Sequence, residues 1–308
     1  MGGVVAGAGA MARRHPILRG FTILAAVCLA LVVVGAAVAV LGGSGGLAER
    51  FAFGPSVGVV ELRGVIQDGT DVIDALERFR KQDGTVAVVV RVDSPGGAVA
   101  PSQEIYDAVW RVRERKPVVA SLGNVAASGG YYVASAANVI FADPGTVTGS
   151  IGAIMSVPFY APLAEKVGVA EQVVKSGRFK DTGQPLRPMT ADERVLLQAM
   201  VDDVLTQFVE AVARGRGMEA TRVRELADGR IYSGTQARAV GLVDRLGGLA
   251  DATRLAWEQG GQTGEPRVAR ERMHHRPWWL DLLGETLLGN TRGPSGGLQF
   301  LYPGPSVE

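Results

Sequence analysis

The chain has few residues of the types on which many catalytic sites are built. Its 308 residues include one cysteine, Cys28, and three histidines. A single cysteine excludes an internal disulfide and a zinc site with several thiolate ligands. His274 and His275 lie in a tail with Pro and Trp, and His15 precedes a long apolar run. A Ser-His-Asp triad would have to take its imidazole from one of these peripheral segments, so the sequence argues against such a triad.

Strong net charge is also lacking. The formal net charge of +1 gives no electrostatic field for nucleic acid, so we expect no nucleic-acid partner. Aromatic residues make up 6% of the chain, whereas 42 residues are glycine. This composition favours a fold with many tight turns and small-residue packing. The length supports one large domain or two small ones.

Lysine is scarce, because only five of the 32 basic residues are lysines. Arginine keeps its proton at any working pH, whereas a desolvated lysine amine can be neutral near pH 7 and act as a base. Two of the five, Lys175 and Lys180, fall in the short segment Lys-Ser-Gly-Arg-Phe-Lys-Asp. The sequence therefore offers two candidate bases, although exposure to solvent is the usual state of a lysine.

A candidate nucleophile lies 52 positions before Lys180. Ser128 opens the run Ser-Gly-Gly-Tyr-Tyr at the start of an expected helix, where the helix dipole favours an anionic transition state. Together with a lysine it predicts a serine nucleophile served by a lysine base. The structural alternative is that Ser128 only caps its helix, as serine often does.

An uncharged apolar run covers residues 21–41. As a helix it would be about 30 Å long, enough to cross the hydrocarbon core of a bilayer. Arg13, Arg14 and Arg19 precede it, so the positive-inside rule predicts a cytoplasmic segment 1–20 and a main domain outside the cytoplasm. Residues 42–54 form a Gly-rich linker. The alternative is a cleaved signal peptide with a small-residue site at 37–39.

The remaining chain alternates between strand and helix patterns, which predicts an α/β fold with a mostly parallel sheet. Residues 93–97 and 148–152 are expected to form loops. Ligands of such sheets collect at the carboxyl ends of the strands, where the Gly-Gly pairs 96–97 and 129–130 lie. The expected strands are 57–62, 86–92, 118–122, 138–142 and 171–175, and the expected helices are 71–80, 102–115, 128–137, 190–214 and 233–240.

The Gly-Gly pairs have a chemical interpretation. Acyl transfer needs backbone N–H groups close to the developing oxyanion, and glycine lets the backbone approach a substrate closely. Gly97 and Gly129 are the candidate donors. The structural alternative is that these glycines only make turns.

Five motifs in order make the chain resemble the signal peptide peptidase A family, in the short form with one catalytic repeat. The resemblance covers about residues 55–257. The motifs are Asp93-Ser94-Pro95-Gly96-Gly97, Ala127-Ser128-Gly129-Gly130-Tyr131-Tyr132, Thr148-Gly149-Ser150-Ile151-Gly152, Ser176-Gly177-Arg178-Phe179-Lys180-Asp181, and Gly229-Arg230-Ile231-Tyr232-Ser233-Gly234 with Gly241-Leu242-Val243-Asp244.

The resemblance implies a membrane-bound Ser-Lys protease with the Clp protease/crotonase-like fold, a spiral of βα units. It implies that Ser128 is the nucleophile, Lys180 rather than Lys175 the base, Gly97 an oxyanion donor and Ser150 the hydroxyl that positions the lysine amine. No metal and no cofactor are implied. We also expect the side chain of Asp181 to point away from the Lys180 amine.

The implied protease domain covers residues 55–260, and residues 261–308 form a tail. The implied substrates are remnant signal peptides and other hydrophobic or unfolded segments. The resemblance also implies a homo-oligomer in which Ser128 of one chain meets Lys180 of its neighbour. Two alternatives remain open: an acyl-CoA enzyme of the crotonase type, and a non-catalytic oligomeric scaffold at the membrane.

Overall fold

A computed structural model describes Leu29, residues 54–270 and residues 299–301. The expected transmembrane segment 21–41, apart from Leu29, and the segments around it lie outside the described residues. Within the described part, no helix combines the length and apolar character that crossing a bilayer requires. The described strands and the helices discussed below belong to one compact unit, Gly54–Glu308.

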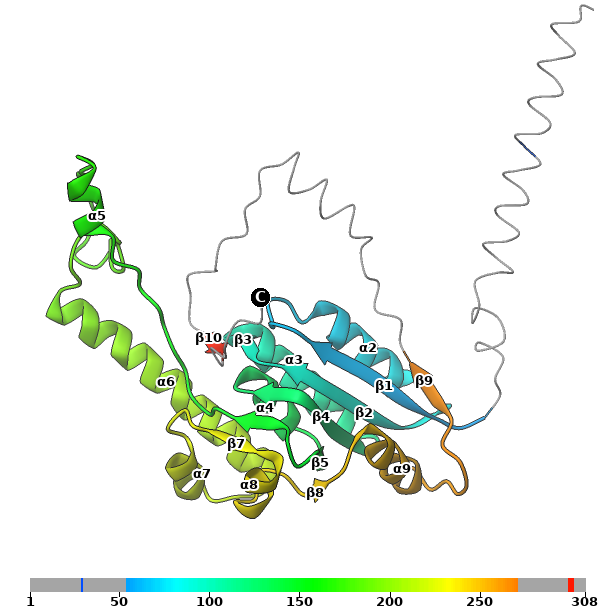
Figure 1. Ribbon diagram of the computed structural model, residues 1–308. Helices are drawn as coiled ribbons and strands as arrows, with labels where there is room; N and C mark the ends of the chain where they lie inside the picture. Colours follow the sequence, from blue (N-terminus) through cyan, green and yellow to red (C-terminus); the bar gives the residue numbers. More distant parts are fainter. Residues whose placement is uncertain (1–28, 30–53, 271–298, 302–308) are drawn as a thin grey trace, which may run out of the picture. The chain divides into compact units, whose positions relative to one another are not determined.

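A mostly parallel sheet forms the centre of this unit (Figure 1). The strand order is β7-β6-β4-β2-β1-β9, with β5 between β4 and β8, and only β7 runs antiparallel to its neighbour. This arrangement fits the expected Clp protease/crotonase-like fold. The strands are β1 (Ser56–Arg63), β2 (Thr85–Ser94), β4 (Val118–Ala127), β5 (Val139–Ala142), β6 (Val147–Gly149), β7 (Ile231–Ser233), β8 (Arg245–Leu246) and β9 (Val268–Arg270).

Helices cover both faces of the sheet, so its central strands are buried on both sides. Val88 and Val90 of β2 face the main core formed with α2 (Thr70–Lys81), α3 (Val99–Arg113) and α4 (Gly129–Ser135). Ala87 and Val89 face a second core with α9 (Leu249–Gln259). Each fully buried valine contributes about 1.5–3 kcal/mol. The continuous apolar pattern of this strand follows from burial on both faces.

The two halves of the long helix α6 (Ala191–Arg216) differ in burial. Its second half is buried, with Phe208 fully enclosed, and the backbone of Gly215 lies against α4. Its first half, in contrast, exposes Val195, Leu196 and Met200. Two short helices, α7 (Ala220–Leu226) and α8 (Gly234–Ala239), follow it.

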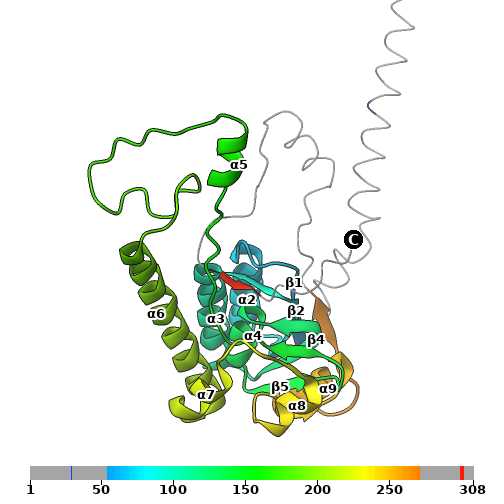
Figure 2. The same ribbon diagram turned by 60° about the vertical axis from the view of Figure 1, so that its left-hand side comes forward.

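Residues 165–180 form an exposed arm that includes the end of α5 (Ala161–Lys166) and leads back toward α6. Figures 1 and 2 show α5 and the adjoining loops away from the sheet. The strand expected at 171–175 is wrong, since these residues form no strand and Val174 is fully exposed. A strand needs a neighbour for its backbone groups, and the described part of the chain provides none for this segment.

The other expected strands and helices are present, with ends shifted by a few residues. The loop expected at 93–97 is more extended than predicted, because β2 continues to Ser94 and Gly96–Ala98 form a further short strand, β3. The loop expected at 148–152 likewise begins inside β6. Both differences arise because turn residues pair with neighbouring backbone: Thr148 pairs with Ala126 of β4, and Gly97 pairs with Ile66, which lies outside the strands.

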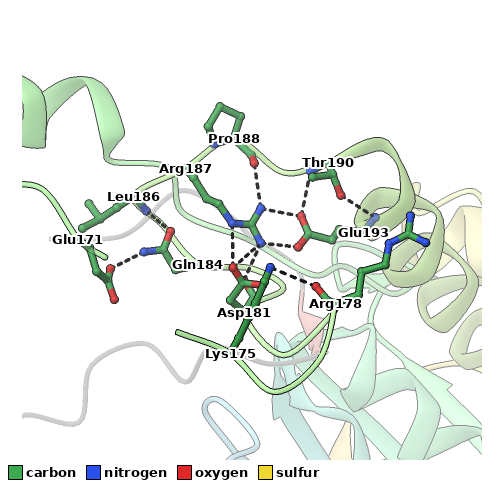
Figure 3. Close-up of polar contacts among 10 residues, drawn as sticks. All are labelled: Glu171, Lys175, Arg178, Asp181, Gln184, Leu186, Arg187, Pro188, Thr190 and Glu193. Carbon is green, nitrogen blue, oxygen red and sulfur yellow. Dashed lines mark hydrogen bonds and ion pairs between the residues drawn. The ribbon is translucent and has the colours of Figure 1, made fainter. Parts of the chain in front are cut away.

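A capping box fixes the start of α6 (Figure 3). Thr190 accepts the N–H of Glu193, and the Glu193 carboxylate accepts the N–H of Thr190 in return. Arg187 donates to both oxygens of the same carboxylate, which is almost completely buried. The Arg187 and Thr190 hydrogen bonds lower the pKa of Glu193 to about 2. The ionised carboxylate thus connects Arg187, in the segment between the arm and α6, to the first turn of the helix.

The contact between α6 and α4 gives a stability prediction. A methyl group at position 215 would lie 2.1 Å from the Ser135 carbonyl oxygen. Overpacking destabilises the fold by about 1–3 kcal/mol, whereas the higher helix propensity of alanine stabilises it by only about 1 kcal/mol. We expect Gly215→Ala to lower the melting temperature by several degrees in a thermal scan. Gly145→Ala, which enters open space, is the control, and equal melting temperatures for both variants would contradict the packing.

The capping carboxylate gives a pH prediction. Its folded pKa lies below the ordinary value of 4.5, so its contribution to stability is present above that pH and is lost as the pH falls toward about 2. Between those pH values, wild-type stability should fall more steeply than that of Glu193→Gln in denaturant titrations. Glu165→Gln, at an exposed carboxylate of α5, should keep the wild-type slope. Parallel slopes for wild type and Glu193→Gln would contradict the assigned role.

Candidate active site

Ser128 lies in a strained turn between β4 and α4. Its backbone has φ 52° and ψ −119°, and only Ser150 shares a positive φ among the described non-glycine residues. Such conformations cost on the order of 1–3 kcal/mol and are typical of functional sites. The Ser128 N–H donates to the Gly149 carbonyl at 2.8 Å, and the Ser128 carbonyl accepts from Tyr132 N–H at 2.8 Å. These bonds hold the turn in place.

The side chain of Ser128 does not cap its helix. Ser128 occupies the N-cap position of α4, but its side chain makes no capping hydrogen bond. The capping interpretation of this serine is therefore wrong. Ser128 is 1% exposed, so its hydroxyl is held inside the site and not at the open surface.

Ser150 lies beside Ser128 because their strands are neighbours. Ala127 of β4 pairs with Gly149 of β6. Ser128 directly follows Ala127, and Ser150 directly follows Gly149. Ser150 is 6% exposed, and its N–H donates to the Arg230 carbonyl at 2.8 Å. The turn after β6 thus places a second hydroxyl-bearing residue next to the first.

The two Gly-Gly turns pack against each other at this edge of the sheet. A Cβ atom on Gly96 would lie 2.7 Å from the Gly129 nitrogen, and one on Gly97 would lie 2.0 Å from the Ile66 carbonyl oxygen. Neither position has room for a side chain. Gly129, at the start of α4, directly follows Ser128, so the backbones of both turns meet beside the serine.

Lys180 lies in the exposed arm. Its side chain is exposed, and no hydrogen bond joins Lys180 to Ser128 within the described part of the chain. The neighbouring Asp181 carboxylate instead accepts from Lys175 at 2.6 Å and from Arg187 at 3.1 Å (Figure 3). A single chain therefore places Ser128 close to Gly97, Gly129 and Ser150. It does not place Lys180, the candidate base, in contact with Ser128.

Aromatic side chains border the site on the side of α4. Tyr131 is fully buried and donates to the Leu242 carbonyl at 2.8 Å, and burial raises its pKa. Tyr132 packs edge-on against Tyr106 with ring centres 5.1 Å apart, and burial raises its pKa to about 12. Both phenols are protonated at neutral pH. They contribute shape and hydrogen bonds, but no charge, to the surroundings of Ser128.

Sequence reasoning missed several short strands at this site: β3 and β6 lie where loops were expected, and one further strand was not expected at all. β10 (Gln299–Leu301) comes from the expected tail and pairs antiparallel with β3. The only sequence signal for it is a short apolar run after a Gly- and Pro-rich stretch. β9, in the same expected tail, pairs with β1.

The arrangement is suited to acyl transfer. It offers a serine in a strained turn and closely packed glycine backbone from which N–H donors for an oxyanion can come. Among the described residues, no group of three or more His, Cys, Asp and Glu side chains is placed to hold a metal ion.

Comparison with known proteins identifies related chains. Residues 111–262 match the profile of peptidase family S49. A Synechocystis protein named "Putative protease" is 46% identical over 199 residues, which cover 64% of this chain and 72% of the relative. "Serine protease SPPA, chloroplastic" of Arabidopsis thaliana is 35% identical over 60% of this chain and 28% of its own length. "Protease 4" of Haemophilus influenzae is 31% identical over 79% and 41%, respectively.

Residues 111–262, which match the family profile, include Ser128 and the strands β4 and β6 on either side of its turn. The last two relatives are longer proteins, and the matched regions span less than half of each. The chain belongs to peptidase family S49, and it is a serine protease of the signal peptide peptidase A family.

Proposed function

We propose that the protein is a membrane-anchored endopeptidase that hydrolyses remnant signal peptides and other hydrophobic or unfolded segments with a Ser128–Lys180 dyad. The observation that carries this proposal is the strained turn that buries Ser128 without using its side chain as a helix cap. Holding a serine in this conformation costs stability, which is typical of a functional role.

The proposed mechanism uses the backbone on both sides of the serine. Neutral Lys180 takes the hydroxyl proton as Ser128 Oγ attacks a peptide carbonyl, and the N–H groups of Gly97 and Gly129 stabilise the oxyanion. The leaving amine takes the proton from Lys180, and an acyl-enzyme remains. Water, deprotonated by Lys180, then releases the product and restores Ser128. The Ser150 hydroxyl accepts a hydrogen bond from the amine and positions it.

A neighbouring copy of the chain would supply the lysine. The arm and the first turns of α6 expose more large apolar side chains than a solvated surface needs, and such patches mark interaction sites. Contact with a second copy would cover them and remove water from Lys180, which favours the neutral amine that a base requires. The exposed side chains are Phe159, Tyr160 and Leu163 just before the arm, Val167, Val169, Val173, Val174 and Phe179 in the arm, and Val195, Leu196 and Met200 in α6.

The apolar run at 21–41 supports the membrane anchor and the location of the protease domain. With arginines on its N-terminal side, this run would hold residues 1–20 in the cytoplasm and the domain on the outer side. A protease at that position meets signal peptides left in the bilayer. The tether would thus raise the local concentration of substrates that are themselves in the membrane.

The dyad is tested by single substitutions in the full chain. Ser128→Ala and Lys180→Ala should each lower the rate of cleavage of an unfolded protein or a signal-peptide mimic by on the order of 10³-fold or more. Peptide products are followed by mass spectrometry. Lys175→Ala, in the same segment, is the control and should stay active. Full activity of Lys180→Ala would contradict the base, and turnover of an acyl-CoA thioester without peptidase activity would contradict the protease.

Sharing of the site between subunits is tested by mixing. Neither Ser128→Ala nor Lys180→Ala subunits alone contain a complete dyad, but a mixed oligomer contains interfaces where an intact Ser128 faces an intact Lys180. We expect mixing, after dissociation and reassembly, to restore a measurable fraction of wild-type peptidase activity. Reassembled mixtures that form wild-type-sized oligomers, verified by light scattering, and yet stay inactive would contradict a shared site.

A further inference from the structure

Strand β4 is irregular just before it reaches Ser128. Val92 of β2 pairs with Leu122 of β4. Ser94, two residues further along β2, pairs with Ala126, which is four residues further along β4. β4 therefore has two more residues than β2 over this stretch, and the extra residues form a β-bulge. Figure 1 shows β2 and β4 side by side in the sheet, and β4 leads directly into α4.

The bulge determines how far Ser128 reaches along the edge of the sheet. Without it, Asn124 would lie opposite Ser94, and Ser128 would lie two residues, or about 6–7 Å, further along the strand direction. Attack on a carbonyl needs the reacting atoms about 3–3.5 Å apart. A shift of that size would separate the serine from Gly97, a proposed oxyanion donor. A productive position of Ser128 thus depends on the bulge.

Asp93, the β2 residue opposite the bulge, supplies a side-chain partner for the bulged backbone. One oxygen of its carboxylate accepts the Val125 N–H at 3.2 Å. The same side chain lies so close to β4 that a Cβ atom on Gly123 would be 2.7 Å from the Asp93 Cγ. The Asp93 backbone carbonyl accepts the Gly64 N–H at 3.0 Å. Asp93 therefore connects the bulge of β4 to the residue that follows β1.

A second side chain holds the bulge from the side of β6. Thr146, directly before β6, is 2% exposed and donates its hydroxyl to the Gly123 carbonyl at 2.8 Å. Asn124, between the two residues that these side chains hold, is exposed. Two backbone groups of the bulge thus bond to side chains. A buried backbone group that loses its partner destabilises the conformation that buries it.

The bulge needs an oxygen from Asp93 and not its charge. Arg63 lies opposite Asp93 in the pairing of β1 with β2, but its mostly exposed guanidinium pairs with Glu61 at 2.6 Å. The contact with β4 is a hydrogen bond from a neutral backbone N–H. The side-chain oxygen of an asparagine accepts such a bond as well. Substitution by asparagine therefore separates the role of the oxygen from that of the charge.

We propose that Asp93 is a positioning residue for the nucleophile, because its side-chain oxygen holds the β4 bulge in the shape that brings Ser128 beside the Gly96–Gly97 turn. Asp93 acts through the backbone of β4. Its role is distinct from that of Gly97 in the same motif, the proposed oxyanion donor. This inference rests on the proposed function, since it takes Ser128 as the nucleophile.

The role is tested in the full chain with a signal-peptide mimic that carries a fluorophore and a quencher. Asp93→Ala should lower kcat at least tenfold and change KM by less than about twofold, because a displacement of about 1 Å at the reacting atoms can cost about 100-fold. Asp93→Asn keeps the accepting oxygen and should keep kcat within about threefold of wild type.

Asn138→Ala is the matched control, because Asn138 Oδ1 accepts the Val118 N–H at 2.9 Å at the other end of β4. It should keep the wild-type kcat. Thermal unfolding verifies that each variant is folded at the assay temperature, so a general loss of stability would not separate Asp93→Ala from this control. A folded Asp93→Ala protein with the wild-type kcat would overturn the inference, and so would an Asp93→Asn protein as slow as Asp93→Ala.

Thr146→Val provides a second test if Asp93→Ala does not fold. It removes the hydrogen bond to the Gly123 carbonyl and keeps the shape of the side chain. Because it loosens the same bulge from the other side, it should lower kcat several-fold and leave KM nearly unchanged. A wild-type kcat in Thr146→Val would then overturn the inference.

Hydrogen exchange separates this inference from the proposed function. Mass spectrometry of peptides that cover residues 123–128 should show at least tenfold faster amide exchange in Asp93→Ala, but not in Asp93→Asn or Asn138→Ala. Unchanged exchange in Asp93→Ala would overturn the inference and leave the Ser128–Lys180 dyad in place. Faster exchange in Asp93→Ala, together with full peptidase activity of Ser128→Ala, would retain the contact of Asp93 with the bulge and refute the proposed nucleophile.

Discussion

The close approach of two glycine turns at the carboxyl edge of the sheet is the constraint on which the site depends. Gly96 and Gly129 pack so tightly that a single added carbon on Gly96 would lie 2.7 Å from the Gly129 nitrogen. Ser128 sits in this junction with an unfavourable backbone conformation, held by hydrogen bonds to Gly149 and Tyr132. Rigid, buried strands on both sides supply the stability that offsets this strain.

In the described part of the chain, the buried scaffold and the exposed arm carry different parts of the proposed site. The sheet and the helices on its faces fix the serine and the backbone around it, whereas the arm carries Lys180 among exposed apolar side chains. A base supplied by a neighbouring copy would make activity depend on assembly. Under the proposed sharing of the site, a protease that has not reached its oligomeric form would not cleave other proteins.

Much of the fold could be predicted from the sequence, because its core strands are nearly continuous apolar runs and its turns carry Gly and Pro. The pattern of β2, for example, requires burial on both faces, and the structure provides it. The helix after Ser128 could be predicted equally well, because the strand before it fixes its position. The glycine turns could also be placed, because parallel strands end at a common edge.

Some features could not be predicted, and they depend on contacts that sequence patterns do not encode. The segment 171–175 has the composition of a strand, but no strand in the described chain pairs with it, and its residues are exposed. β10 is only three residues long, and its place beside β3 depends on one buried side chain, Phe300. The first half of α6 likewise exposes Val195, Leu196 and Met200, at apolar positions that the sequence pattern does not distinguish from buried ones.

The central claim is that Ser128 is a nucleophile activated by Lys180. Its most direct test is reaction of the assembled full-length protein with a fluorophosphonate probe, followed by peptide mass spectrometry to locate the adduct. A single adduct on Ser128, which forms far more slowly in Lys180→Ala, is the result predicted here. An adduct on another serine, or labelling of Ser128 at the same rate in Lys180→Ala, would contradict it.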